Sequence, residues 1–90
     1  MPPEPVVIVA ARRTAIGSFQ GVLGTVSAPA LFAAAGRACL ADSGIDPADI
    51  GECLVGQVLM AGAGQAPARQ ASLGAGLPTS VPTTTVSKVC

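Results

Sequence analysis

The chain contains three short segments rich in apolar or β-branched residues, at 6–11, 53–59 and 83–89. The first, VVIVAA, has no polar position. An uninterrupted apolar run of this length is typical of a strand that is covered on both faces in a parallel sheet. We therefore expect a first buried strand at 6–11, a second buried strand at 53–59 and a third strand at 83–89.

The first predicted helix has a recognisable start and stop. Ser27 can cap the helix, and Pro29 is tolerated in the first turn that follows. Residues 29–42 are rich in alanine, which has the highest helix propensity, and Gly44 can end the helix.

A second helix is predicted at 66–75, with Pro67 in its first turn. Residues 12–27 contain several glycines and no regular apolar period, which predicts an ordered loop. The order strand, helix, strand, helix, strand is typical of an α/β fold, in which parallel strands are joined by right-handed crossovers. We therefore expect a β-α-β-α-β unit with its helices on a mostly parallel sheet.

The apolar side chains are mostly small. Half of the 90 residues are hydrophobic, but the chain has two Phe and no Trp or Tyr. Small side chains bury little area, so a gain of about 25 cal/mol per Å² is modest against an ordering cost of roughly 1 to 2 kcal/mol per residue. We infer that this segment normally packs against something else.

The charge balance argues against two classes of partner. Five basic and five acidic residues give a formal net charge of zero, so the chain lacks the basic surface expected of a protein that binds nucleic acid or an anionic membrane. Beyond Glu52, only Arg69 and Lys88 are charged. The weakly charged stretch 58–89 therefore indicates an interface or a core, and we expect it to form much of a contact between identical subunits.

The cysteines and the N-terminal residues indicate the compartment. Cys39, Cys53 and Cys90 form no C-x-x-C pair, and the chain has no histidine, so we expect no metal site. An odd number of cysteines fits a reducing compartment. MPPEP lacks the basic and apolar regions of a signal peptide, and VVIVAA is too short to cross a bilayer. We expect a cytoplasmic protein.

The segment AGAGQAPARQ follows a predicted strand and opens a predicted helix, as does the phosphate-binding loop of dinucleotide-binding proteins. Here Pro67 stands at the third glycine position, and no acidic residue follows Glu52 to hold a ribose. We expect a glycine-rich turn without a bound nucleotide cofactor, ordered by Gln65 and Arg69. In the alternative, Arg69 only solvates a helix face.

Cys90 differs from the other two cysteines in its place. Cys39 is expected in a helix and Cys53 in a buried strand, where a thiol behaves as a small hydrophobe. Cys90 stands at the carboxyl end of the third predicted strand, the edge at which open parallel sheets bind ligands. A helix beginning directly after it would favour the thiolate through the helix dipole. Position alone leaves two interpretations open, a catalytic nucleophile and a buried cysteine at a strand end.

Three stretches together resemble the thiolase family of acetyl-CoA acetyltransferases: VVIVAARRTAIGSFQG, GQVLMAGAGQAPARQASLGAGLP and VPTTTVSKVC. The resemblance covers nearly the whole chain and corresponds to the N-terminal quarter of a thiolase. It is most specific at 56–90, where the family's G-Q-V-x-x-A-G-x-G-Q-x-P-A-R-Q loop and N-K-V-C motif occur in order. The chain departs from the family at Ala15, where the family has the proline of R-T-P-x-G, and at Ser87, where it has the asparagine of N-K-V-C.

The resemblance implies a layered α/β thiolase fold with Cys90 as the catalytic nucleophile. The cysteine would take an acyl group from acyl-CoA and pass it to acetyl-CoA in a Claisen condensation or, in reverse, to free CoA in thiolysis. By resemblance, the backbone N–H of Cys90 also contributes to an oxyanion hole. The implied substrates are coenzyme A thioesters, with no permanently bound cofactor.

The remaining catalytic groups of the family, histidines and a second cysteine, belong to later motifs. We therefore expect residues 1–90 to be the N-terminal portion of the thiolase N-terminal domain, with the remainder of the subunit outside this chain. The resemblance also implies a homodimer or homotetramer. Two other interpretations stay open, a noncatalytic thiolase-like subunit or interaction module, and a decarboxylating condensing enzyme of related fold.

Overall fold

Helix α1 (Ala28–Ser43) begins and ends where the sequence predicts. The computed structural model describes residues 4–89. The Ser27 hydroxyl accepts a hydrogen bond from the Ala30 N–H at 3.2 Å, which caps the first turn. At the other end Gly44 adopts a left-handed conformation with φ 67°, and its N–H donates to the Leu40 carbonyl. Both predicted ends are confirmed to within one residue.

Strands β1 (Cys53–Gly56) and β2 (Thr83–Val86) pair in parallel, with Cys53 opposite Thr83 and Gly56 opposite Val86. They are the second and third predicted strands, and their parallel direction is confirmed. Both are three residues shorter than expected, because regular pairing stops at Gly56 and Val86.

Helix α2 (Pro67–Gly74) is the crossover that a parallel pair of strands requires. It has no side-chain cap of its own, and the Ala68 N–H donates to Thr85 Oγ1 of β2 at 3.1 Å. Ser72 is fully buried, and its hydroxyl accepts from Thr83 Oγ1 at 3.2 Å. Thr83 and Thr85 share one face of β2, since side chains alternate along a strand. Two threonines of one strand therefore hold α2 against the sheet.

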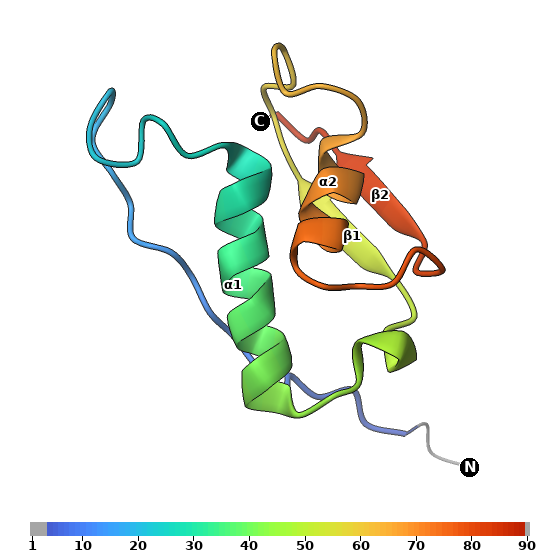
Figure 1. Cartoon of the computed structure of the whole chain (residues 1–90). Coiled ribbons are helices and arrows are strands. Elements are labelled where there is room, and N and C mark those ends of the chain that lie inside the picture. Colours follow the sequence, from blue (N-terminus) through green and yellow to red (C-terminus); the bar gives the residue numbers. More distant parts are fainter. Residues whose placement is uncertain (1–3, 90) are drawn as a thin grey trace.

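The core lies between α2 and the sheet. It contains Cys53 and Val55 of β1, Ala68 of α2 and Val81, with Phe32 of α1 packed against them. Figure 1 shows α2 in front of the two strands and α1 beside α2. The short 3₁₀ helix η1 (Pro47–Asp49) connects α1 to β1. The α/β class is confirmed, with helices packed on a parallel sheet.

The two α-helices approach each other through small residues. A Cβ atom added to Gly36 of α1 would lie 3.0 Å from the Ala75 Cβ, and one added to Gly74 of α2 would lie 3.1 Å from the Ala33 Cβ. Contacts of 3.0–3.4 Å are tighter than nine in ten real Cβ contacts, so an added methyl group would push the neighbour away by a few tenths of an ångström. The spacing of α1 and α2 therefore depends on the two glycines.

The predicted buried strand at 6–11 is wrong for the described structure. This segment passes behind the lower end of α1 and rises on its side away from the sheet (Figure 1), with Val6 99% and Ile8 89% exposed. A β-branched run forms a strand only where a neighbouring strand supplies backbone partners. Within residues 4–89 the segment is tied to α1 instead, because Arg12 forms an ion pair with Asp42.

Replacing Gly36 by valine is expected to destabilise the full-length protein by about 1–3 kcal/mol, because the added side chain overlaps Ala75 across the α1–α2 contact. The free energy of unfolding in urea measures this. Gly51→Ala is the control, since an added Cβ there meets no atom within 4 Å and its effect should stay within about 0.5 kcal/mol. Equal effects of the two substitutions would contradict the tight contact.

Candidate active site

The carboxyl ends of β1 and β2 meet at one edge of the sheet because the two strands are parallel (Figure 1). From β1 the chain continues into the glycine-rich loop, residues 57–66, and from β2 it continues through residues 87–89. Cys90 is the next residue and lies outside the described residues. Ligands of open α/β sheets bind beyond this edge, which is therefore the candidate active site.

The two strand ends are joined by bonds that involve Gln57. Its backbone N–H donates to the Val86 carbonyl at 3.0 Å, and its own carbonyl accepts from Ser87 Oγ at 3.0 Å. The side-chain Nε2 of Gln57 donates to the Leu59 carbonyl at 3.0 Å. One residue thus ties the end of β2 to the start of the glycine-rich loop.

Gln70 of α2 holds the rest of the glycine-rich loop. Its Nε2 donates to the Ala63 carbonyl at 2.9 Å and to the Gln65 carbonyl at 2.8 Å. Gly64 has φ 81°, and a Cβ there would lie 3.1 Å from this nitrogen, so the loop needs glycine for both backbone conformation and space. The prediction that Gln65 helps to order the loop holds for its carbonyl, which accepts one of these bonds, whereas its side chain makes no hydrogen bond within residues 4–89.

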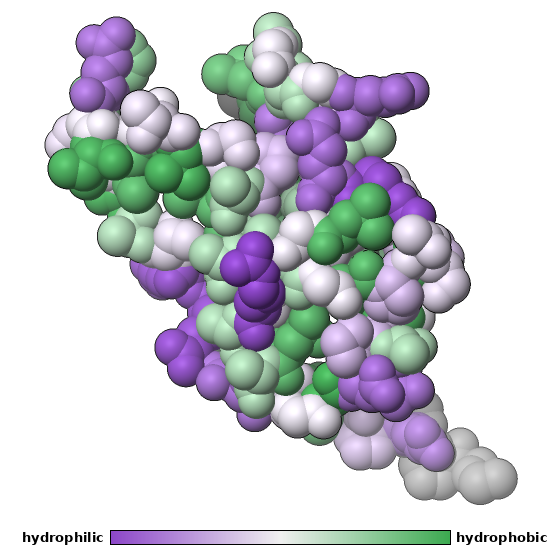
Figure 2. All heavy atoms as spheres, viewed as in Figure 1, coloured by the Kyte–Doolittle hydropathy of each residue, from purple (hydrophilic) through white to green (hydrophobic). Residues whose placement is uncertain are grey.

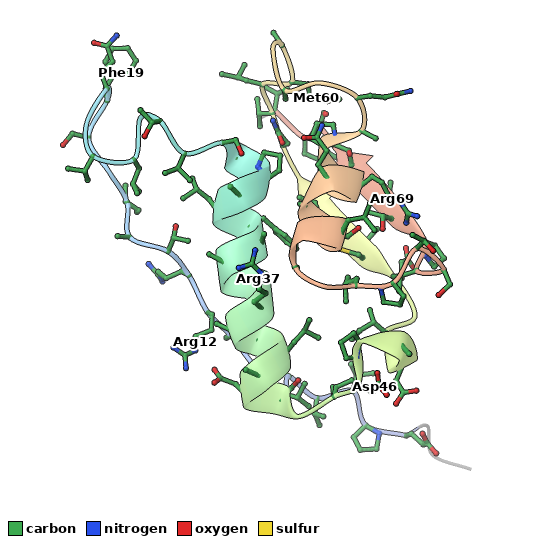
Figure 3. The ribbon with its side chains drawn as sticks, viewed as in Figure 1. Arg12, Phe19, Arg37, Asp46, Met60 and Arg69 are labelled. Atoms are coloured by element: carbon green, nitrogen blue, oxygen red, sulfur yellow. The ribbon has the colours of Figure 1, made fainter. Side chains whose placement is uncertain are left out.

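Arg69 also differs from its prediction. Its guanidinium donates to the Thr79 carbonyl at 2.7 Å and to the Val81 carbonyl at 3.1 Å, both in the turn that enters β2. Figure 3 shows the side chain directed toward this turn and away from the glycine-rich loop. Neighbouring residues of a helix point about 100° apart, so Gln70 reaches one loop and Arg69 the other. The alternative of a merely solvated arginine is wrong as well.

A groove of about 290 Å³ lies between residues 27–29, at the start of α1, and the glycine-rich loop. Gln57 and Gln70, which hold the loop, also line the groove, and its walls mix polar and apolar atoms. Among residues 4–89, no three His, Cys, Asp or Glu side chains come together as a metal site would require. In the same part of the chain, neither α-helix has the length and apolar character needed to cross a membrane.

The two described cysteines lie away from this edge. Cys53 begins β1, at the opposite end of the strand, and is buried in the core. Burial raises the pKa of its thiol, so Cys53 stays protonated and unreactive at neutral pH. Cys39 is a free, half-buried thiol of α1. These positions agree with the structural roles expected of both.

Replacing Gln70 by alanine should loosen the glycine-rich loop, because one amide group supplies the bonds to Ala63 and Gln65. Hydrogen exchange of the backbone amides at 57–66 is expected to become about tenfold faster, which corresponds to about 1.4 kcal/mol. Gln65→Ala is the matched control and should leave exchange unchanged. Faster exchange in the control than in Gln70→Ala would contradict this assignment.

The chain is similar in sequence to one protein family and to several named proteins. The family described as "Thiolase, N-terminal domain" matches residues 6–90. The chain is 55% identical over 87 residues to an acetyl-CoA acetyltransferase of Pseudomonas aeruginosa, an alignment that covers 97% of the chain and 22% of that relative. It is 54% identical over 85 residues to an acetyl-CoA acetyltransferase of Chromobacterium violaceum, with 94% of the chain and 22% of the relative covered.

A vertebrate relative gives the same result. The mitochondrial acetyl-CoA acetyltransferase A of Xenopus laevis is 53% identical over 85 residues, which covers 94% of the chain and 20% of the relative. The chain thus spans about a fifth of the length of the curated relatives it matches. The family match runs through the glycine-rich loop, both strands and the last residue, Cys90. This chain belongs to the thiolase family, to the region that forms that family's N-terminal domain.

Proposed function

We propose that the protein containing this chain is an acetyl-CoA acetyltransferase that works through an acyl-cysteine intermediate on Cys90. The observation that carries the proposal is the identity of 55% over 87 residues to a protein of that name, in a match that includes the glycine-rich loop. The geometry supports it, because the parallel strands direct the loop and the residues before Cys90 to one edge of the sheet. Residues 1–90 are then the N-terminal portion of a longer subunit.

The chemistry needs a nucleophile that is also a good leaving group. The Cys90 thiolate attacks the carbonyl carbon of an acyl-CoA, and the bond from that carbon to the CoA sulfur breaks. CoA leaves as a thiolate, and the acyl group stays activated as a thioester on Cys90. A base then removes a proton from the methyl group of acetyl-CoA, and the resulting carbanion attacks the acyl carbon and expels the cysteine thiolate.

This chain supplies only part of that machinery. It contains no histidine, and its acids all lie before Cys53, so the proton-transferring groups are proposed to come from the remainder of the subunit. The described residues contribute a rigid support, since Gln57 and Gln70 fix the glycine-rich loop at the edge that leads to Cys90. The substrates are CoA thioesters, and no permanently bound cofactor is required.

Several apolar side chains of this chain are exposed and would be covered by the remainder of the subunit or by a second subunit. Leu59 is 82% exposed in the glycine-rich loop, and Leu73 of α2 and Val89 are exposed as well. Figure 2 shows apolar groups gathered at the glycine-rich loop and at the separate loop 16–26, whose tip carries Phe19 (Figure 3). We propose that the weakly charged stretch 58–89 forms much of a homodimer contact and that loop 16–26 packs against the rest of the subunit.

The proposed compartment is the cytoplasm. Both described cysteines are free thiols, which is in keeping with a reducing environment. The Xenopus relatives are named mitochondrial, so separating cytosolic from organellar or envelope fractions of the source cells tests this assignment.

Cys90→Ala in the full-length protein is expected to lower the acetyltransferase rate by about a thousandfold or more, because no acyl-enzyme can form. In the native protein a limiting alkylating reagent should label Cys90 before Cys39 and Cys53, and prior incubation with acyl-CoA should protect it. Peptide mass mapping measures the labelling. Full activity of Cys90→Ala would rule out the nucleophile.

Sedimentation of the full-length protein is expected to give the mass of two or four subunits. The physical reason is that 58–89 carries only two charged residues, Arg69 and Lys88, and that the core of a subunit contact is depleted in charge. A monomer at micromolar concentration would contradict the proposed homo-oligomer and leave the Cys90 assignment standing.

A further inference from the structure

We infer that Ser87 is a positioning residue for Cys90, because its hydroxyl ends the pairing of β1 with β2 and so sets the direction in which the chain leaves β2. The inference rests on the proposed role of Cys90, which follows Ser87 by three residues.

The bonds at the strand end change from backbone to side chain at Ser87. The Gln57 N–H donates to the Val86 carbonyl at 3.0 Å, as a parallel ladder requires. The next bond of such a ladder would run from the Lys88 N–H to the Gln57 carbonyl. Within residues 4–89 that carbonyl accepts instead from Ser87 Oγ at 3.0 Å. A side chain satisfies the last carbonyl, so the backbone can turn away from the sheet at Lys88.

A second acceptor lies close to the same hydroxyl. Met60 Sδ is 3.1 Å from Ser87 Oγ, and Figure 3 places Met60 at the glycine-rich loop. A hydroxyl has one hydrogen to donate, and a carbonyl oxygen is a stronger acceptor than a thioether. The bond to the Gln57 carbonyl therefore fixes the hydroxyl, and Met60 packs against it. Through one oxygen atom Ser87 connects the end of β2 with the glycine-rich loop.

Cys90 follows Ser87 by only three residues, so the direction of the backbone at Ser87 matters for the proposed nucleophile. Three residues span at most about 10 Å, so a change of direction at Ser87 moves the Cys90 thiol directly. A nucleophile displaced by about 1 Å can lose up to about a hundredfold in rate, whereas substrate binding elsewhere is unaffected. Ser87 should therefore influence the chemical step more than the affinity for acyl-CoA.

The experiment compares Ser87→Ala with Ser87→Thr in the full-length protein. Ser87→Ala is expected to lower kcat about tenfold or more, to leave KM for acyl-CoA within about twofold, and to slow alkylation of Cys90 at neutral pH. Ser87→Thr keeps the hydroxyl and should recover most of kcat.

Ser18→Ala is the matched control. Ser18 is exposed, lies outside the stretch 58–89, and its side chain makes no hydrogen bond within residues 4–89, so all three measurements should stay at the wild-type values. Thermal unfolding is recorded for every variant. A loss of kcat in Ser87→Ala at an unchanged melting temperature supports positioning.

Two outcomes overturn the inference in distinguishable ways. Wild-type kcat and alkylation in Ser87→Ala, with Cys90→Ala inactive, would refute the role of Ser87 and leave the proposed function intact. Activity in Cys90→Ala would refute the proposed function itself. If Ser87→Ala fails to fold, an inactive but folded Ser87→Thr would refute the role of the hydroxyl, and an active Ser87→Thr would support it.

Discussion

The parallel alignment of β1 and β2 is the constraint on which the rest of this structure depends. Parallel neighbours cannot be joined by a tight turn, so the chain must travel back along the sheet before the second strand begins. Helix α2 makes that return, and Thr83 and Thr85 of β2 anchor it. As a result, the glycine-rich loop and the residues before Cys90 leave the sheet in the same direction. An antiparallel pair would have sent them to opposite ends.

Local rules predicted the elements that depend on local chemistry. Ser27 and Gly44 marked the ends of α1, because a hydroxyl cap and a left-handed glycine act within one helical turn. The strands predicted at 53–59 and 83–89 are present at 53–56 and 83–86, because each of them pairs with the other. The run at 6–11 is also rich in β-branched residues but has no partner strand within residues 4–89, and a local sequence pattern does not show whether a partner is present.

The candidate site could be predicted only in outline. Its edge of the sheet and Cys90 followed from strand order and from the resemblance to thiolases. The contacts of Gln70, Arg69 and Ser87 could not be predicted, because each joins a side chain to a carbonyl in a different segment. Such bonds depend on the helix rotation and on the strand register, and one residue of error in either would choose another side chain.

These bonds also explain how loops with so few charges remain ordered. Beyond Glu52 there is no carboxylate for Arg69 to pair with, and its guanidinium donates to main-chain oxygens instead. Carbonyls are present at every residue, so a donor of sufficient length can stabilise a turn of any composition. Arg69, Gln70 and Ser87 of this region therefore donate their hydrogen bonds to backbone carbonyls.

The contact between α1 and α2 has a consequence for conformational entropy. Glycine and alanine have no side-chain rotamers to lose when they are buried, so Gly36 and Ala75 can meet without the ordering cost that leucine or methionine would carry. The same absence of rotamers leaves the contact unable to adapt, since no side chain can rotate away from an added methyl group. Packing of the two helices therefore costs little side-chain entropy, but the contact tolerates larger side chains poorly.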